Sequence, residues 1–284
     1  MTTTSVAPAR GPSGPSGPAA GGYAGFVNLM RAEWTKIRSV RSTVWTLAAF
    51  IIVSIGITAL LSWLTASHWN GPHAAARDAT ILTDPVSFIM GAGVGLGQLA
   101  ICVLGVLVIT TEYSTGVVRA SLLAVPRRIP MLAAKAVVFA VLVLVVTEIA
   151  AFCSFFIGSS ILHAHVAVSL SDSGVTRAVA GAGLYLTVLG LFALAIGTLI
   201  RHTAGAISAV IGVVLVLPIL SGLLPGSWGA HINAYLPEQA GTMITHTQEV
   251  SGDLLSPWQG FGVLCLWAAL LLAAGAYLLR RRDA

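Results

Sequence analysis

A polar segment separates two long apolar runs in this sequence: Glu112-Tyr-Ser-Thr-Gly-Val-Val-Arg-Ala-Ser-Leu-Leu-Ala-Val-Pro-Arg-Arg-Ile-Pro-Met-Leu-Ala-Ala-Lys135. The run before it, Phe88–Thr110, and the run after it, Ala136–Ile157, each have about the 20 apolar residues that a helix needs to cross a membrane. The quoted segment therefore predicts a polar connection between two spanning helices.

The composition extends this interpretation to the whole chain. Of 284 residues, 56% are hydrophobic and only 9% are charged, whereas a soluble domain has roughly 25% charged residues. Six continuous apolar runs are predicted to span the membrane: Val44–Leu64, Phe88–Thr110, Ala136–Ile157, Ala178–Ile200, Ala204–Leu224 and Phe261–Leu279. Because these runs do not alternate between apolar and polar residues, we expect helices and not barrel strands. The predicted fold class is all-α, a polytopic membrane protein with six transmembrane helices.

The distribution of basic residues predicts the orientation. With six spans, both termini lie on one side, and of the fifteen Lys and Arg only Arg77 and Arg177 fall on the other, which leaves thirteen on the side of the termini. The positive-inside rule then predicts a multi-pass protein of the cytoplasmic (inner) membrane with both termini cytosolic. The net charge of +5 is explained by helix ends near anionic headgroups, so nucleic acid is not expected as a partner.

Two regions precede the first span. Residues 1–22 are rich in Pro, Gly, Ala and Ser and are predicted to be a disordered tail. In the next region, up to Arg41, apolar side chains recur at helical spacing: Tyr23, Phe26, Val27, Met30, Trp34 and Ile37. We expect an interfacial helix that lies along the inner leaflet on this stripe, with Glu33 and Lys36 away from it.

The glycines within the spans predict close helix packing. Gly91, Gly93, Gly95 and Gly97 form two overlapping GxxxG pairs, and three glycines of the fourth run recur every seven residues: Gly183, Gly190 and Gly197. Small residues on one helix face let two backbones approach closely. For any given pair of glycines, packing within one subunit is favoured over packing between subunits. A role in a subunit interface stays open.

The polar segment also resembles the cytosolic coupling segment of ABC-2 type transporter permeases. In that family a glutamate ends the second span, a glycine and a short amphipathic helix follow, and a proline with basic residues precedes a lysine at the third span. The matching residues here are Glu112, Gly116, Val117–Val125, Pro126, Arg127, Arg128 and Lys135. Two further stretches are similar to the family: Arg31–Lys36 to its connecting helix, and Tyr235-Leu-Pro-Glu238 to its outer, partly re-entrant helical hairpin between spans five and six.

The resemblance covers residues 23–284 as one ABC-2 transmembrane domain and implies the permease subunit of an ATP-driven exporter. Its implied partners are an ATP-binding ABC subunit, the lipid bilayer, and a second permease, as a homodimer or with a sibling. The resemblance implies that these residues transmit ATP binding to the spans: Glu112, Gly116, Arg119, Leu122, Pro126 and Arg127. The chain has no G-x-x-x-x-G-K-[ST] phosphate loop, so it is not predicted to be the ATPase itself, and no cofactor is expected.

Two other function classes stay open. Glu148 is the one acidic residue deep in an apolar run, where a carboxylate either couples protons or fastens two helices as a hydrogen-bonded glutamic acid. A gradient-driven carrier would need several paired intramembrane charges and an internal repeat, neither of which is evident. A non-transporting membrane scaffold is the other alternative.

His163 and His165 lack further ligands at suitable spacing, so no metal site is predicted.

Overall fold

The computed structural model describes residues 22–69, 81–114, 128–224, 227–248 and 253–281, which form helices and no strands. The predicted all-α class is therefore confirmed. The long helices are α1 (Gly22–Ser39), α2 (Arg41–Ser67), α4 (Pro85–Ser114), α6 (Arg128–Leu162), α7 (Val175–Ile200) and α12 (Pro257–Arg281). The shorter elements are α8 (Thr203–Ile211), η1 (Gly212–Val216), α9 (Leu217–Gly222), α10 (Ser227–Ala234), α11 (Pro237–Thr242) and η2 (Met243–Thr245).

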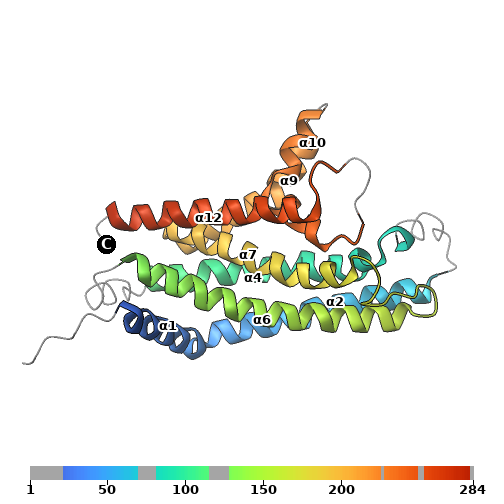
Figure 1. The fold of residues 1–284 in the computed structure, drawn as a ribbon, viewed down its shortest axis with the longest axis horizontal. Helices are drawn as coiled ribbons and strands as arrows, with labels where there is room; N and C mark the ends of the chain where they lie inside the picture. The colour runs from blue at the N-terminus through green and yellow to red at the C-terminus, as the bar shows by residue number, and fades with distance from the viewer. Residues whose placement is uncertain (1–21, 70–80, 115–127, 225–226, 249–252, 282–284) are drawn as a thin grey trace, which may run out of the picture.

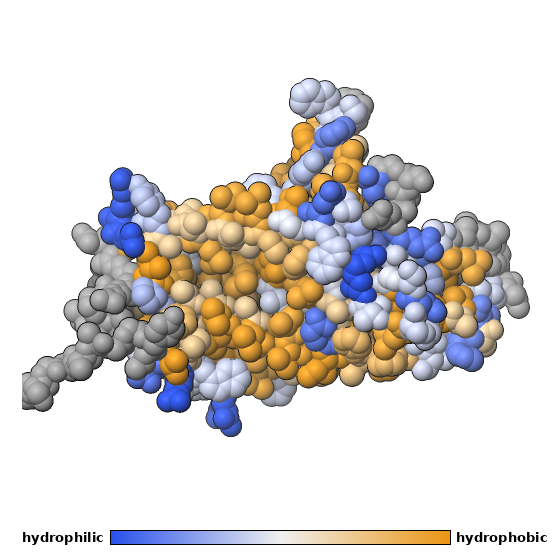
Figure 2. Space-filling model, in the orientation of Figure 1, coloured by the Kyte–Doolittle hydropathy of each residue, from blue (hydrophilic) through white to orange (hydrophobic). Residues whose placement is uncertain are grey.

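Within the described residues, six helical segments are long and apolar enough to cross a membrane: α2, α4, α6, α7, the α8–α9 segment and α12. They run side by side in Figure 1, and Figure 2 shows a broad apolar belt between hydrophilic ends. We call the end that carries α1, the start of α6 and the end of α12 the terminal end of the bundle, on the left in Figure 1. The predicted multi-pass membrane architecture is confirmed.

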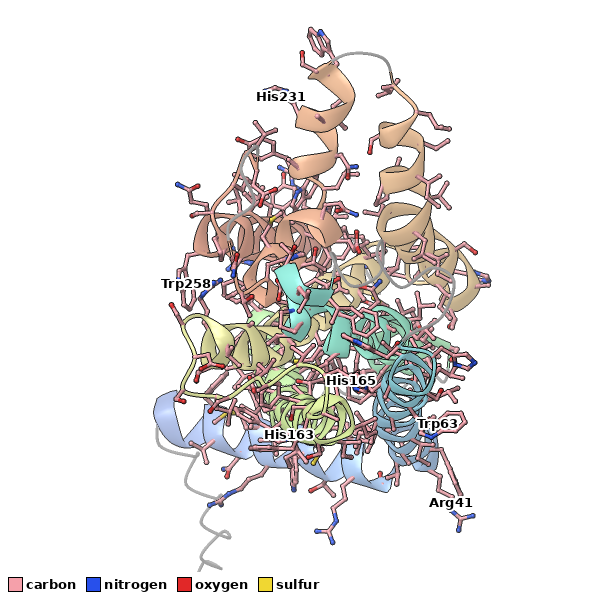
Figure 3. All side chains as sticks on the ribbon, turned by 90° about the vertical axis from the view of Figure 1, so that its right-hand side faces the viewer. Arg41, Trp63, His163, His165, His231 and Trp258 are labelled. Carbon is pink, nitrogen blue, oxygen red and sulfur yellow. The ribbon has the colours of Figure 1, made fainter. Side chains whose placement is uncertain are left out.

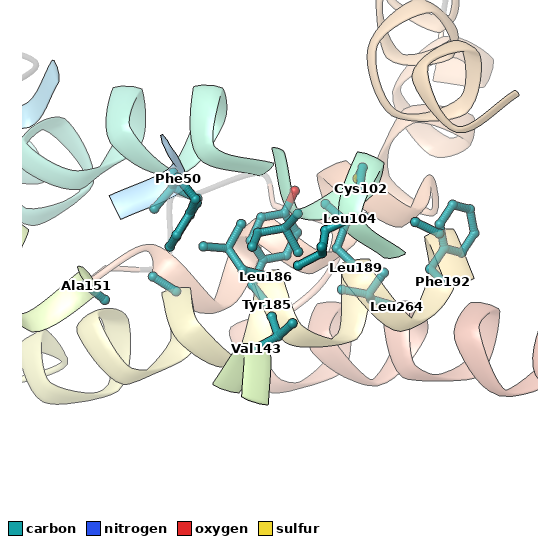
Figure 4. Close-up of a cluster of buried hydrophobic side chains, with 14 of the residues drawn as sticks. Phe50, Cys102, Leu104, Val143, Ala151, Tyr185, Leu186, Leu189, Phe192 and Leu264 are labelled. Atoms are coloured by element: carbon teal, nitrogen blue, oxygen red, sulfur yellow. The ribbon is translucent and has the colours of Figure 1, made fainter. Parts of the chain in front are cut away.

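The core of the bundle is built around α7. In its most apolar stretch 78% of the residues are buried, compared with 17% in the α8–α9 segment. Figure 4 shows side chains of α7 that meet side chains of α2, α4, α6 and α12 in one apolar cluster. Its members include Tyr185, Leu186, Leu189 and Phe192 of α7 with Phe50, Leu104, Val143 and Leu264. The outward faces of the peripheral spans are left apolar, as contact with lipid requires.

The glycine pairs of α4 divide between two faces. A Cβ placed on Gly93 would lie 2.7 Å from the Ser54 carbonyl oxygen of α2, and one on Gly97 would lie 2.7 Å from the Phe50 ring. At Gly91 and Gly95 a Cβ would meet nothing within 4 Å. The Gly93–Gly97 pair therefore serves packing within the chain, as predicted, because only glycine lets α4 approach α2 this closely.

The seven-residue glycine repeat of α7 also lies at contacts within the chain. A Cβ on Gly190 would lie 3.0 Å from side-chain carbons of Ile101 in α4 and of Phe139 in α6, and one on Gly197 would lie 2.6 Å from Ile109 of α4. Small residues at these positions allow α7 to take the central place in the bundle, in contact with α4 and α6 together.

The fifth span, predicted over Ala204–Leu224, is one helical segment over Thr203–Gly222 that contains an irregular turn. The helix widens into the π-helical turn η1, in which the Leu217 N–H bonds to the Gly212 carbonyl. Pro218 follows directly, and its ring lacks an N–H and clashes with the carbonyl four residues earlier, so the regular ladder must open. Beyond this turn α9 and α10 project away from the bundle, with His231 near the tip in Figure 3.

The described part of the connection between the fifth and sixth spans contains the short helices α10, α11 and η2, and the partly re-entrant outer hairpin stays a prediction. After the extended Leu236, Pro237 begins α11, a position where its fixed φ suits a helix. The end of this connection is tied to α4, because Asp84 accepts hydrogen bonds from the Thr247 N–H (2.9 Å) and hydroxyl (2.8 Å). Burial raises the pKa of Asp84, but bonds from His246, Ser87 and Thr247 hold it well below its usual range.

Candidate functional site

Two glutamates and two lysines meet at the terminal end, and we call them the ion cluster. The Lys135 ammonium donates to Glu33 Oε2 (2.5 Å) and to Glu112 Oε1 (2.8 Å). The Lys36 ammonium donates to Glu33 Oε1 (2.7 Å) and to Glu112 Oε1 (3.2 Å). Each lysine therefore bridges both carboxylates, and the four charges sum to zero.

The ion cluster is largely removed from solvent. Glu33, Glu112 and Lys135 are 3%, 8% and 1% exposed, whereas the Lys36 side chain is 35% exposed. Burial raises the pKa of the Glu33 carboxyl, but Lys135 and Lys36 together hold it below its usual range. Burial lowers the pKa of Lys36, but Glu33 and Glu112 raise it above its usual range. Both groups stay charged at neutral pH, since buried charges persist where they are paired.

Three helices supply the ion cluster. Glu33 and Lys36 lie three residues apart on one face of α1, Glu112 lies in the last turn of α4, and Lys135 lies on α6. The sequence placed Lys135 at the start of a span that began at Ala136. That boundary is wrong, because α6 begins at Arg128 and Lys135 lies about two turns inside it. A lysine so placed cannot extend to water at a helix end, so it pairs within the protein.

α1 packs on the bundle through a face that the sequence did not indicate. Glu33 was expected to lie away from the apolar stripe along the inner leaflet, and it is buried together with Ile37, which belongs to that stripe. Trp34 and Val27, which belong to the predicted stripe, are 45% and 41% exposed. The pairing with Lys135 explains the difference, because it allows a carboxylate to face the protein while the apolar residues are left toward lipid.

An aromatic contact extends the site toward the end of the fourth span. Arg201 ends α7 in a left-handed conformation (φ 60°), and its guanidinium carbon lies 5.2 Å from the centre of the Tyr113 ring. Tyr113 follows Glu112 in α4, so this cation–π contact joins the α7–α8 turn to the ion cluster.

A pocket of about 350 Å³ adjoins the ion cluster between the α1–α2 junction and α4. Its apolar wall includes Ile37, Val40, Leu104, Leu107 and Val108, and its charged end is Lys36, Glu112 and Lys135. Glu112 Oε2 is buried and has no hydrogen-bond partner in the described part of the chain. A buried carboxylate oxygen without a donor costs free energy, so this atom is a place where a ligand could add a bond.

The structure describes only one of the six residues that the resemblance implies transmit ATP binding to the spans. Glu112 is described and belongs to the ion cluster. Five members lie outside the described residues: Gly116, Arg119, Leu122, Pro126 and Arg127. The structure adds Glu33, Lys36 and Lys135 to Glu112. The feature of the sequence that points to these residues is the rarity of lysine. The chain has only two lysines, and both belong to the ion cluster.

Glu148 lies near the middle of α6, against Gly183 of α7. A Cβ on Gly183 would lie 2.5 Å from the Glu148 carboxyl carbon, so the carboxyl group occupies the space that the missing side chain leaves. Its Oε2 atom is buried without a hydrogen-bond partner in the described residues. This fit favours the packing role among the two that the sequence left open.

Glu148→Gln is therefore expected to change the free energy of unfolding by less than about 1 kcal/mol, because the amide keeps the shape and hydrogen-bonding capacity of a neutral carboxyl. Glu148→Lys is expected to reduce the amount of inserted protein, since lysine at the centre of a span costs about 2.5–3.5 kcal/mol. Membrane yield and thermal melting in detergent measure both. A Gln variant as impaired as the Lys variant would show that the carboxylate itself is needed.

The described histidines of the connections at the end opposite the terminal end do not gather into one site. His163 and His165 lie together after α6, where the His165 ring packs on Trp69 with 4.4 Å between ring centres. Figure 3 shows His231 on the projecting α10, away from both. Among the described residues, no group of three or more His, Cys, Asp or Glu could hold a metal ion.

The fold and these contacts define the class of protein: an all-α, multi-pass membrane protein with six spanning helices and a buried ion cluster at one end. No family model matches the chain, and no curated protein matches its sequence.

Proposed function

We propose that this chain is the membrane-spanning permease subunit of an ABC-2 type exporter, which moves a substrate out of the cytoplasm with energy from a separate ATP-binding subunit. In this proposal both termini are cytosolic, two permeases pair, and residues 115–127 contact the ATP-binding partner. Gradient-driven transport and a scaffold role are the competing classes.

The observation that carries the proposal is the bond between Glu112 and Lys135 (2.8 Å). Residues 115–127 connect α4 to α6, and these two side chains join the helices on either side of that connection. Both also bind residues of α1, so a displacement of the connection would move α1, α4 and α6 together. Such a contact between three helices supports the proposal that a partner moves the connection, because rigid elements in contact carry energetic coupling from one site to another.

Orientation is tested by labelling single cysteines in a background without Cys102, Cys153 and Cys265. Arg38 and His163 are exposed and lie at opposite ends of the bundle. We expect a membrane-impermeant maleimide to label His163→Cys on intact cells and Arg38→Cys only after permeabilisation, because the positive-inside rule puts the basic end in the cytosol. The reverse pattern would contradict the orientation and the proposed docking of an ATPase.

Coupling is tested by charge reversal in the connection. The double variant Arg119→Glu/Arg127→Glu places acidic groups where basic groups are proposed to meet the ATP-binding partner, and like charges across an interface repel. We expect at least about a tenfold loss of ATP hydrolysis in the complex purified from native membranes, because the repelled partner docks less often.

The matched control is Arg38→Glu/Arg281→Glu, which makes the same charge change at two exposed positions of the terminal end. It is expected to keep the parental ATPase activity. Equal activity in both double variants would refute the role of the connection. A wild-type preparation with no ATP hydrolysis at all would favour the carrier or the scaffold.

A further inference from the structure

The pocket beside the ion cluster has the shape and chemistry of a site for an amphipathic molecule. Its volume of about 350 Å³ lies within the range of about 300–1,000 Å³ that is usual for small-molecule sites. One side is apolar and is formed by the α1–α2 junction and the last turns of α4, while the other side carries charges. A ligand that fits both sides must have an apolar chain next to a polar head.

The neighbouring surface indicates that the ligand reaches the pocket from the bilayer. Val40, which lines the pocket, is 44% exposed. The first two residues of α2, Arg41 and Ser42, are exposed and polar, and one turn further Val44 and Trp45 are 56% and 74% exposed. These side chains lie at the start of a spanning helix, so their exposed surface meets lipid. The apolar wall therefore lies at the depth of acyl chains and the charged end near the headgroups.

The charged end defines the head of the ligand. Glu112 lines the pocket, and its Oε2 atom is buried without a partner among the described residues, so it can accept a bond from an N–H donor once the carboxylate turns toward the pocket. The Lys36 side chain is 35% exposed and can donate one more hydrogen bond beyond those to Glu33 and Glu112. Because the ion cluster is neutral as a whole, a head with one positive and one negative group adds no net charge.

We infer that this pocket binds a zwitterionic phospholipid with a primary-amine head, a phosphatidylethanolamine, in the membrane leaflet at the terminal end. Its ammonium donates to Glu112 Oε2, its phosphate accepts from Lys36, and an acyl chain covers Val40, Leu107 and Val108. The inference does not depend on the proposed transport function, because it rests on the pocket and the unpaired carboxylate oxygen alone.

The test compares lipids that differ only in the head. The purified full-length protein, stripped of lipid in detergent, is titrated with phosphatidylethanolamine, phosphatidylcholine or phosphatidylglycerol of identical chains, and bound lipid is counted by native mass spectrometry. We expect phosphatidylethanolamine to bind at least about tenfold more tightly than either of the others, a difference of about 1.4 kcal/mol. Choline has no N–H donor for Glu112, and glycerol has no cation.

Variants locate the binding site. Leu107→Trp and, in parallel, the smaller change Val108→Phe fill the apolar wall and should remove the preferential binding. Leu96→Trp is the matched control, since Leu96 lies on the same helix, is 46% exposed and does not line the pocket. Equal binding of phosphatidylcholine or phosphatidylglycerol would overturn the inference. The melting temperature without lipid shows which pocket variant folds as the wild type does. If that variant still prefers phosphatidylethanolamine, the inference is wrong.

Discussion

Replacing Lys135 with methionine is expected to lower the free energy of unfolding by about 3–5 kcal/mol, the usual cost of removing one partner from a buried ion pair. Lys135 is 1% exposed and binds both Glu33 and Glu112. Methionine fills similar volume, so the loss comes from two buried carboxylates that keep only Lys36 as a partner. Thermal or denaturant melting of the purified protein in detergent measures the effect.

Two variants isolate the electrostatic origin of that loss. Lys36→Met removes the more exposed lysine and is expected to cost about 1 kcal/mol or less, as exposed pairs do. The triple variant Glu33→Gln/Glu112→Gln/Lys135→Met removes the buried charges together and should recover most of the stability, because neutral replacements of buried ion pairs are often tolerated. A triple variant as unstable as Lys135→Met would show that shape, not charge, accounts for the loss.

Replacing Gly105 with alanine is expected to cost about 3 kcal/mol, at the upper end of the range for overpacked cores. At the contact of α4 with α7, a Cβ on Gly105 would collide with the Gly190 carbonyl oxygen and lie 3.2 Å from the Ala193 Cβ. A backbone carbonyl cannot rotate away as a side chain can, so α4 and α7 must separate. The melting transition in detergent reports the change.

Gly95→Ala is the matched control for this prediction. Gly95 lies on the same helix, and a Cβ there would meet nothing within 4 Å. Alanine is the better helix former by about 0.5–1 kcal/mol, so this variant should be as stable as the parent or slightly more so. Similar losses at both positions would mean that the α4–α7 contact is looser than the structure indicates.

These variants also show how far the candidate site could be predicted from the sequence. Glu112 was found because it begins a polar segment between two apolar runs, and the five further candidates between Gly116 and Arg127 lie outside the described residues. Nothing in the sequence indicated that Glu33 is buried, because helical spacing groups apolar residues and gives no means to recognise a buried carboxylate. Its partner Lys135 is 102 residues away along the chain.

The sequence by itself determined the class of fold and the approximate limits of six spans. These are local properties, since a stretch of about 20 apolar residues in lipid must satisfy its backbone hydrogen bonds within itself and so forms a helix. Only the tertiary structure decided which helices meet. It brought Glu33, Lys36, Glu112 and Lys135 together, placed α7 at the centre, and divided the glycines of α4 between a packed and an open face. Such contacts depend on the three-dimensional approach of distant segments, and hydropathy carries no record of that approach.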